Sequence, residues 1–185
     1  MSESELSGEA LITAGNVAQY LSFLSRNECF ALPIDQVREI IEFEGVTPVP
    51  MMPAFVRGVI NLRGNVVPVI DLASRFGRQR SEAGRRTCII ILELDGDMGL
   101  YRLGLVVDGV DAVLDIAADI IEVAPDFGAG IRTDFIAGMA RHRTGFIIIL
   151  NVGKVLSLED MQVLVEAAQD GADALSVDTG AVMRA

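Results

Sequence analysis

Two segments of the chain, 55–71 and 135–151, align without a gap at an offset of 80 residues. An aromatic residue, a glycine and an arginine recur at matching positions: Phe55, Gly58 and Arg63 in the first segment, Phe135, Gly138 and Arg143 in the second. Each segment is typical of two apolar strands around a tight turn, because glycine and asparagine tolerate the positive φ that a short hairpin loop needs. A shorter pair of segments, 32–35 and 105–108, aligns at an offset of 73. The chain therefore uses one supersecondary unit twice.

The first of these hairpins predicts its own local structure. The turn lies at 63–65, and Asp71 is placed to cap a short helical turn over 72–76. Pro68 has no backbone N–H, so we expect a bulge or an unpaired strand edge beside it. The hairpin contains no nucleophile, metal ligand or phosphate-binding loop. It is best interpreted as a rigid platform.

Short apolar runs bounded by turn residues make up most of the remaining chain. We expect them to form strands at 17–25, 29–34, 41–44, 87–94, 100–107 and 108–116. The residues at 95–97 predict a turn, and three prolines predict an extended loop over 45–53. Many short strands with little helix favour two small antiparallel barrels packed together, since a closed barrel leaves no apolar edge exposed. The predicted fold class is mainly β.

A few segments predict helix or irregular chain. Asp35 occupies a helix N-cap position before a short helical turn at 36–40. A capping-box-like start and an apolar face predict a C-terminal helix over 158–170 that docks on a barrel. We expect a disordered tail over 1–15 and a flexible tail over 171–185, because both are small, polar and acidic.

The formal net charge of −11 narrows the classes of partner. Phosphate neutralisation needs clustered Lys and Arg, so the charge argues against nucleic acid, and it also disfavours an anionic membrane surface. No apolar run reaches the ~20 residues of a membrane span, and the acidic N-terminus lacks a secretory pattern. Cys29 and Cys88 lie in apolar runs and are expected to be buried, reduced thiols, with a disulfide as the alternative. These features favour a cytoplasmic protein.

The inventory of reactive residues gives no catalytic site. The single histidine, His142, lies between two arginines near a turn, which is typical of a solvated turn residue. No P-loop or dinucleotide-binding glycine motif is present, and the D-G-D-x-G run at 95–99 lacks the other ligands of a calcium loop. We therefore expect no catalytic residue, cofactor or metal. The basic segment 77–86 is interpreted as a solvated, mobile loop rather than a binding site.

The run PAFVRGVINLRGNVVPVIDL at 53–72 resembles the signature of the chemotaxis coupling-protein (CheW) family. The similarity extends over about residues 20–156. It implies two small SH3-like β-barrels that share a core and are intertwined within one domain over 16–157. Asn151 departs from the family pattern, which more often has Asp-Leu after the last strand. The fold that the resemblance implies agrees with the one that the repeat predicts.

The resemblance implies an adaptor that couples methyl-accepting chemoreceptors to a CheA-type histidine kinase in a signalling array. It implies that the cytoplasmic tip of the receptor binds between the barrels, at Val37 and Glu39 with Arg63 nearby. Separate barrel-end surfaces would contact the regulatory domain of the kinase. Recruitment to the membrane would then go through the receptors, without insertion of this chain into the bilayer.

The candidate site residues each have a structural alternative. Arg63 either contacts a partner or braces its turn by pairing with Glu39. Arg57 is a further candidate contact, although its strand position favours a solvent-facing residue. Val37 is either a contact or a core residue, and the methionines at 51–52 either dock a partner or pack on the core.

Two alternative functions are compatible with the same sequence. The first is a coupling protein of a surface-motility or developmental chemosensory pathway. The second, of a different class, is a small-molecule-binding β-barrel, which requires a deep apolar pocket with convergent polar groups.

Overall fold

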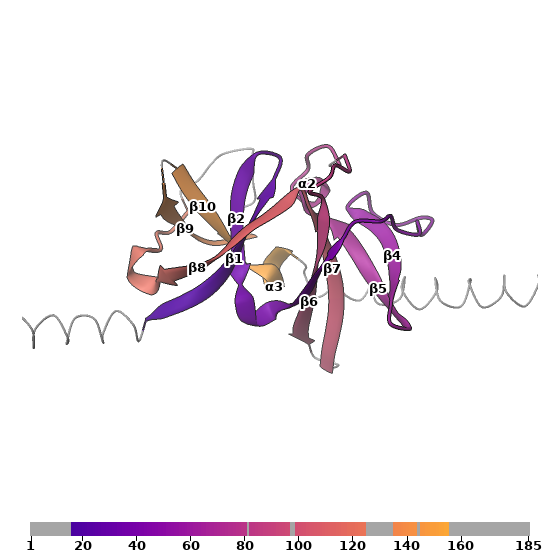
Figure 1. The fold of residues 1–185 in the computed structure, drawn as a ribbon, viewed down its shortest axis with the longest axis horizontal. Coiled ribbons are helices and arrows are strands. Elements are labelled where there is room, and N and C mark those ends of the chain that lie inside the picture. The colour runs from indigo at the N-terminus through magenta and orange to yellow at the C-terminus, as the bar shows by residue number, and fades with distance from the viewer. Residues whose placement is uncertain (1–15, 81, 97–98, 125–134, 144, 156–185) are drawn as a thin grey trace, which may run out of the picture.

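The computed structural model describes residues 16–80, 82–96, 99–124, 135–143 and 145–155. Within these residues ten strands form two five-stranded sheets, which lie side by side in Figure 1. The strand order of the first, sheet A, is β8 (Gly109–Ala117), β1 (Val17–Ser25), β2 (Glu28–Pro33), β10 (Gly145–Leu150) and β9 (Ile136–His142). The order of the second, sheet B, is β3 (Val37–Glu42), β6 (Cys88–Gly96), β7 (Gly99–Val107), β5 (Asn65–Asp71) and β4 (Val56–Leu62). The mainly β fold class is confirmed.

Both sheets have the same pairing pattern, which the two repeats build by exchanging strands. In sheet A, the β1–β2 hairpin joins the β9–β10 hairpin through the parallel pair β2 and β10. In sheet B, the β6–β7 hairpin joins the β4–β5 hairpin through the parallel pair β7 and β5. The chain passes from sheet A to sheet B between β2 and β3, through the 3-10 turn η1 (Ile34–Gln36), and it returns between β7 and β8. Each barrel therefore contains strands of both repeats.

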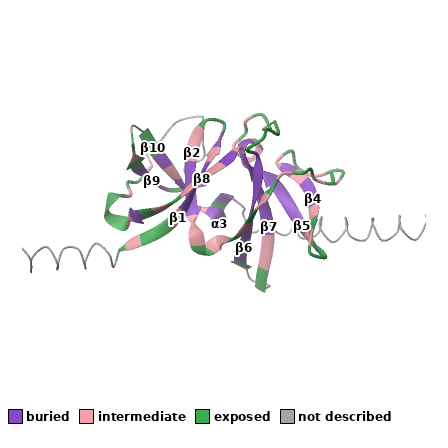
Figure 2. Ribbon diagram, viewed as in Figure 1, coloured by how far each residue is buried: buried purple, intermediate pink, exposed green. Residues whose placement is uncertain are grey.

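The core has three parts, one inside each barrel and one shared between the barrels. Strand β6 shows the division, because alternate residues of a strand face opposite sides. Cys88, Ile90 and Leu92 face the shared core, whereas Ile89 and Ile91 face the interior of the second barrel, which sheet B forms. The first barrel, formed by sheet A, has its own interior cluster. Figure 2 shows buried residues along the middles of the strands in both sheets. The two packed, SH3-like barrels with a shared core are confirmed.

The repeat found in the sequence is confirmed by matching local geometry. The turn arginines of the two long hairpins, Arg63 and Arg143, have φ of 51° and 52°. After each hairpin the chain bonds back to its own start: Asp71 N–H donates to the Phe55 carbonyl at 2.7 Å, and Asn151 N–H to the Phe135 carbonyl at 2.8 Å. The departure at Asn151 therefore leaves this closing hydrogen bond intact.

A preceding loop pairs with the outer strand of each long hairpin at equivalent positions. The two bridges are Thr47–Val59 in sheet B and Glu122–Met139 in sheet A. A glycine comes immediately before the hairpin residue in both cases. A Cβ on Gly58 would collide with the backbone of Thr47, and a Cβ on Gly138 would collide with the side chain of Ile121. The recurring glycines are thus required by the close approach of the loop.

The helical turn predicted at 36–40 is wrong. The 3-10 turn η1 ends at Gln36, and strand β3 already begins at Val37. Asp35 lies inside η1, whose start has no side-chain cap. The apolar residues of β3 pair with the apolar strand β6, and this pairing overrides the local cap signal.

Two other local predictions can be compared with the strands. The turn expected at 95–97 is displaced, because β6 continues to Gly96 and β7 begins at Gly99. The unpaired edge expected beside Pro68 is confirmed on the side facing β7, whose pairing with β5 covers residues 69–71. The segment 45–53 is a loop as predicted, but it is not extended throughout, because a turn lies at Pro50 and Met51 and Thr47 forms a bridge to β4.

Short helical turns follow both long hairpins. The first, α2 (Leu72–Arg75), begins as predicted, with Asp71 Oδ1 accepting a hydrogen bond from Ser74 N–H at 3.0 Å. Its counterpart α3 (Val152–Val155) was not predicted, and the 3-10 turn η2 (Ala118–Ile120) follows β8.

Several predictions fall on parts of the chain that the structure does not describe. These are the helix over 158–170 and the tails over 1–15 and 171–185. Among the described helices, none has the length and apolar character that crossing a membrane requires.

Candidate partner-binding site

The outer strands of sheet B, β3 and β4, are the two edges of the sheet, and a seam lies between them. Arg63, in the β4–β5 turn, spans this seam to Glu39 of β3. Its Nη1 donates to Glu39 Oε1 at 3.0 Å, and its Nη2 donates to Oε2 at 2.8 Å. This bidentate arrangement is the strong geometry for an arginine–carboxylate pair. Two of the predicted site residues are therefore in direct contact.

The exposure of the Glu39–Arg63 pair limits its contribution to stability. The Arg63 side chain is 73% exposed and that of Glu39 is 23% exposed. An exposed ion pair contributes only ~0–1 kcal/mol. The turn also has support of its own, since Gly64 N–H donates to Asn61 Oδ1 at 2.8 Å. The pairing expected of a brace is present, and it holds two charged groups together at the surface.

Strand β3 places one apolar side chain against the core and another at the surface. Val37 is half-buried and packs on the shared core, as its core interpretation predicted. Ile40, which the sequence analysis did not select, is 43% exposed. Its equivalent at the offset of 73 is Val113 of β8, which is 52% exposed. The two strands that cross between the barrels thus present matching apolar residues, and alternation along β3 is the signal that identifies Ile40.

The two loop methionines differ, since one packs on the core and the other is exposed at the surface. Met52 is half-buried and packs against the shared core. Met51 is fully exposed and has a φ of 62°, which is unusual for a residue other than glycine. Of the two, Met51 alone offers its side chain at the surface.

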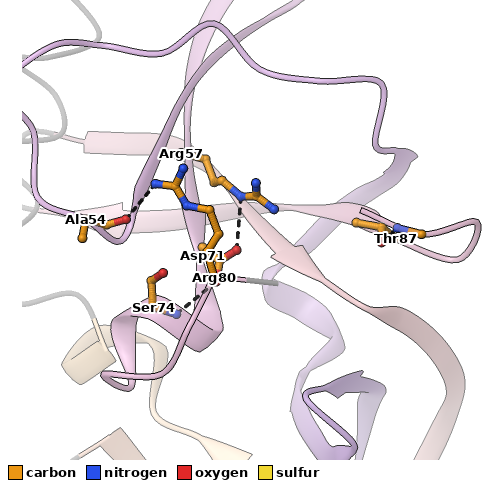
Figure 3. A network of polar contacts seen from close by, with 7 residues as sticks. Ala54, Arg57, Asp71, Ser74, Arg80 and Thr87 are labelled. Carbon is orange, nitrogen blue, oxygen red and sulfur yellow. Dashed lines mark hydrogen bonds and ion pairs between the residues drawn. The ribbon is translucent and has the colours of Figure 1, made fainter. Parts of the chain in front are cut away.

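The prediction that Arg57 faces solvent is wrong. Its side chain is only 12% exposed, and its Nε lies 3.1 Å from Oδ2 of the fully buried Asp71 (Figure 3). The guanidinium also lies 5.2 Å from the centre of the Phe43 ring. The register of β4 against β5 shifts between Val56 and Gly58, so Arg57 is the extra residue of a bulge, and bulges redirect side chains. Arg57 therefore braces the hairpin internally and offers little surface to a partner.

Arg75 was missed by the sequence analysis, although it connects the two repeats. Its guanidinium lies between the rings of Phe55 and Phe135, with its central carbon 4.8 Å from each ring centre. Its Nε donates to the Val155 carbonyl at 2.6 Å, at the end of α3. The recurrence of an aromatic residue at 55 and 135 was the available signal, but only the exchange of strands brings the two rings together. Arg75 helps to fix the barrels relative to each other.

A hollow of about 490 Å³ opens between β3 and β4. Four of its lining residues are polar and exposed, namely Glu42, Glu44, Thr47 and Asn61. A small-molecule site needs an enclosed apolar cavity with converging polar groups. This open, acidic hollow does not have that character, so it does not favour the small-molecule alternative.

The cysteines and the histidine are partly or fully enclosed. Both thiols are free; Cys88 is buried, and Cys29 is half-buried rather than buried as predicted. Burial raises the pKa of both thiols, which disfavours the reactive thiolate. His142 ends β9 and is half-buried, and its enclosed Nε2 has no hydrogen-bond partner among the described residues, so the solvated interpretation is wrong. Over the described ranges, no three His, Cys, Asp or Glu side chains are grouped to hold a metal ion.

A family model for the CheW-like domain matches residues 19–160, which span both barrels. The chain belongs to the CheW-like family. Chemotaxis protein CheW of Klebsiella aerogenes is 34% identical over 166 residues, covering 90% of this chain and 95% of that protein. Protein FrzA of Myxococcus xanthus is 31% identical over 128 residues, covering 68% of this chain and 76% of FrzA.

A solved structure of the same family supports the architecture. The crystal structure of scaffolding protein TtCheW from Thermoanaerobacter tengcongensis superposes with a TM-score of 0.69 at 33% identity. The superposition covers 77% of this chain and 90% of the TtCheW chain. The CheW-like resemblance, the β-rich fold and the placement of the chain in a family of chemotaxis scaffold proteins are therefore confirmed.

Proposed function

We propose that this protein is a non-enzymatic adaptor that couples methyl-accepting chemoreceptors to a CheA-type histidine kinase. The observation that carries this proposal is the exposed Glu39–Arg63 pair, which places an acidic and a basic group together on the surface of a rigid double barrel. A partner side chain can replace either member at low cost, because such a pair contributes only ~0–1 kcal/mol. Ile40, the next residue of the same strand, is also exposed, but alternation directs its side chain to the opposite face of β3 from Glu39.

The mechanism would be geometric. The cytoplasmic tip of a receptor would contact the surface around β3, and the regulatory domain of the kinase would contact a barrel end. Arg75 and the shared core hold the two barrels together, so bound partners would keep a fixed relative orientation. Such an adaptor works in the cytoplasm, needs no cofactor and reaches the membrane through the receptors.

The relatives support this proposal and also one alternative within the same class. The similarity to chemotaxis protein CheW and to the scaffolding protein TtCheW favours coupling in chemotaxis. The similarity to Protein FrzA supports a coupling role in a surface-motility or developmental pathway. The identity of the captured receptor and kinase distinguishes the two.

The test is a pull-down from native lysate with the tagged chain. The bound proteins are washed at two salt concentrations and identified by mass spectrometry. Wild type, Arg63→Ala and Arg143→Ala are compared. Arg143 is the matched control, because it has the same turn geometry but Ala112 stands at the position equivalent to Glu39. We expect wild type and Arg143→Ala to recover a methyl-accepting receptor with a multidomain histidine kinase.

The folded Arg63→Ala variant is expected to recover at least about tenfold less receptor than wild type, because removing one charged contact weakens binding by about that factor. Recovery of neither partner by folded wild type would reject the adaptor function. Unfolding of Arg63→Ala, monitored by circular dichroism, would instead show that the pair is mainly a structural brace.

A further inference from the structure

The described residues of the basic segment 77–86 are exposed apart from the half-buried Arg78, and the segment, expected to be mobile, is attached to the domain at several points. Arg78 forms an ion pair with Glu28 at the start of β2, with an N–O distance of 2.7 Å. Arg80 Nη2 donates to the Ala54 carbonyl at 3.0 Å, close to the Arg57–Asp71 pair (Figure 3). These contacts use the first two arginines after α2 to hold the segment in place.

The segment ends in a closed β-turn, Gly84–Thr87, with Arg85 and Arg86 at its two corners. Thr87 N–H donates to the Gly84 carbonyl at 3.2 Å, and Gly84 N–H donates to Thr87 Oγ1 at 2.7 Å. Thr87 is itself buried, and its carbonyl accepts a hydrogen bond from Phe43 N–H at 3.3 Å. The two corner arginines therefore project from a fixed base.

The side chains of Arg85 and Arg86 are available for binding. Both residues are exposed, and neither side chain has a hydrogen bond or an ion pair within the described part of the chain. The stem of Arg86 lies against Gly109, where a Cβ would be 3.5 Å from both its Cβ and its Nε. This support restricts the stem, so less conformational entropy remains to be lost on binding.

The turn lies in a basic island of an acidic protein. Residues 75–86 contain five of the 15 basic residues and one acidic residue, Glu82, which gives the segment a net charge of +4. The rest of the chain then carries a net charge of −15, which together with the +4 of the segment gives the total of −11. Two acidic residues already have partners: Glu28 pairs with Arg78 of the island, and Asp108 Oδ2 accepts a hydrogen bond from Arg26 N–H at 2.7 Å.

We propose that the Arg85–Arg86 turn is a docking site for an acidic segment of a partner protein. The planar guanidinium matches the two oxygens of a carboxylate, and two adjacent arginines fit neighbouring acidic side chains of one segment. An extended nucleic acid is disfavoured, because the rest of the chain carries a net charge of −15, which repels its many phosphates. The site uses none of the residues of the Glu39–Arg63 pair, and it does not depend on the adaptor proposal.

The experiment measures the binding of a fluorescein-labelled octaglutamate peptide to the full-length chain by fluorescence anisotropy. Measurements at about 50 mM and about 300 mM NaCl separate screened from specific binding. The variant is Arg85→Glu/Arg86→Glu, and the control is Arg141→Glu/Lys154→Glu, which changes the net charge equally at exposed positions outside the island. Overall repulsion between the peptide and a chain of charge −11 opposes binding, so any binding must be local.

We expect wild type to bind at low salt, the turn variant to bind at least about tenfold more weakly and the control to stay within about twofold of wild type. Absence of wild-type binding at low salt, or an equal loss in the control, would overturn the proposal. Tighter binding of a single-stranded oligonucleotide or of anionic phospholipid vesicles than of the peptide would also overturn it. Should the charge reversal impair folding, Arg85→Gln/Arg86→Gln is tested with the same expectation.

Discussion

The buried Arg57–Asp71 pair makes the sharpest prediction about stability. The Asp71 side chain is fully buried and that of Arg57 is 12% exposed, so water cannot replace a missing partner. Removing one member of a buried pair costs ~3–5 kcal/mol, because the other charge stays buried without compensation. We therefore expect Arg57→Met to lower the free energy of unfolding by about 3–5 kcal/mol, which corresponds to a fall in Tm of roughly 6–20 °C for a chain of this size.

Urea unfolding followed by far-UV circular dichroism measures this loss. Arg63→Met is the matched control, and its loss is expected to stay below about 1 kcal/mol because its pair is exposed. The double variant Arg57→Met/Asp71→Asn removes both charges and keeps an amide oxygen that can accept from Ser74 N–H. We expect it to be more stable than Arg57→Met alone. A loss below about 1 kcal/mol in Arg57→Met, or a double variant less stable than the single one, would refute the reasoning.

Four further predictions concern the stability of the domain and the reactivity of its thiols. Gly58→Ala is expected to lower the free energy of unfolding by about 2–4 kcal/mol, because φ is 145° and the new Cβ would collide with the Thr47 carbonyl. Gly64→Ala, whose new Cβ would lie in open space, should lower it by about 1 kcal/mol. Equal losses for the two variants in urea unfolding would contradict this. Burial raises the pKa of the thiols of Cys29 and Cys88, so we expect a disulfide reagent to label half-buried Cys29 faster than Cys88, and both more slowly than in urea. The thiols stay protonated to higher pH in the folded state than in the unfolded state. The free energy of unfolding is therefore expected to be highest below the ordinary thiol pKa of 9.0 and to decline as pH rises above that value. A free energy of unfolding that stays constant as pH rises above 9.0 would be evidence against this prediction. Arg75→Lys is expected to cost about 1–3 kcal/mol, since an ammonium cannot stack on two rings at once, and an unchanged urea midpoint would show that the stacking contributes nothing.

The local features of the hairpins could be predicted from the sequence because short-range chemistry decides them. Strand β1 has the predicted bounds, and the Arg26-Asn27 turn after it has two positive φ values, 52° and 66°. The cap at Asp71 depends on a contact three residues away. The repeat is likewise a property of the residue order, and it predicts two similar units without any knowledge of their packing.

The candidate site could be predicted only in part. The resemblance selected Glu39 and Arg63 together, and the structure joins them. Arg57 was a separate candidate, named for its place on the hairpin and expected to face solvent, and its actual direction depends on a bulge that exists only when β4 pairs with β5. The helical turn expected at 36–40 failed for the same reason, since pairing with β6 outweighs the local signal from Asp35.

By itself the sequence determined the hairpins, their turns, the repeat and the acidic surface, since these follow from neighbouring residues or from composition. Tertiary structure alone decided how the repeats exchange strands between the barrels. That exchange brings Phe55 and Phe135 to opposite sides of Arg75, although 80 residues separate them in the chain. Tertiary structure also decided that the Arg57 side chain is largely buried, whereas Arg85 and Arg86 are exposed. The physical reason is that burial and pairing depend on residues far apart in sequence, whose approach no local pattern encodes.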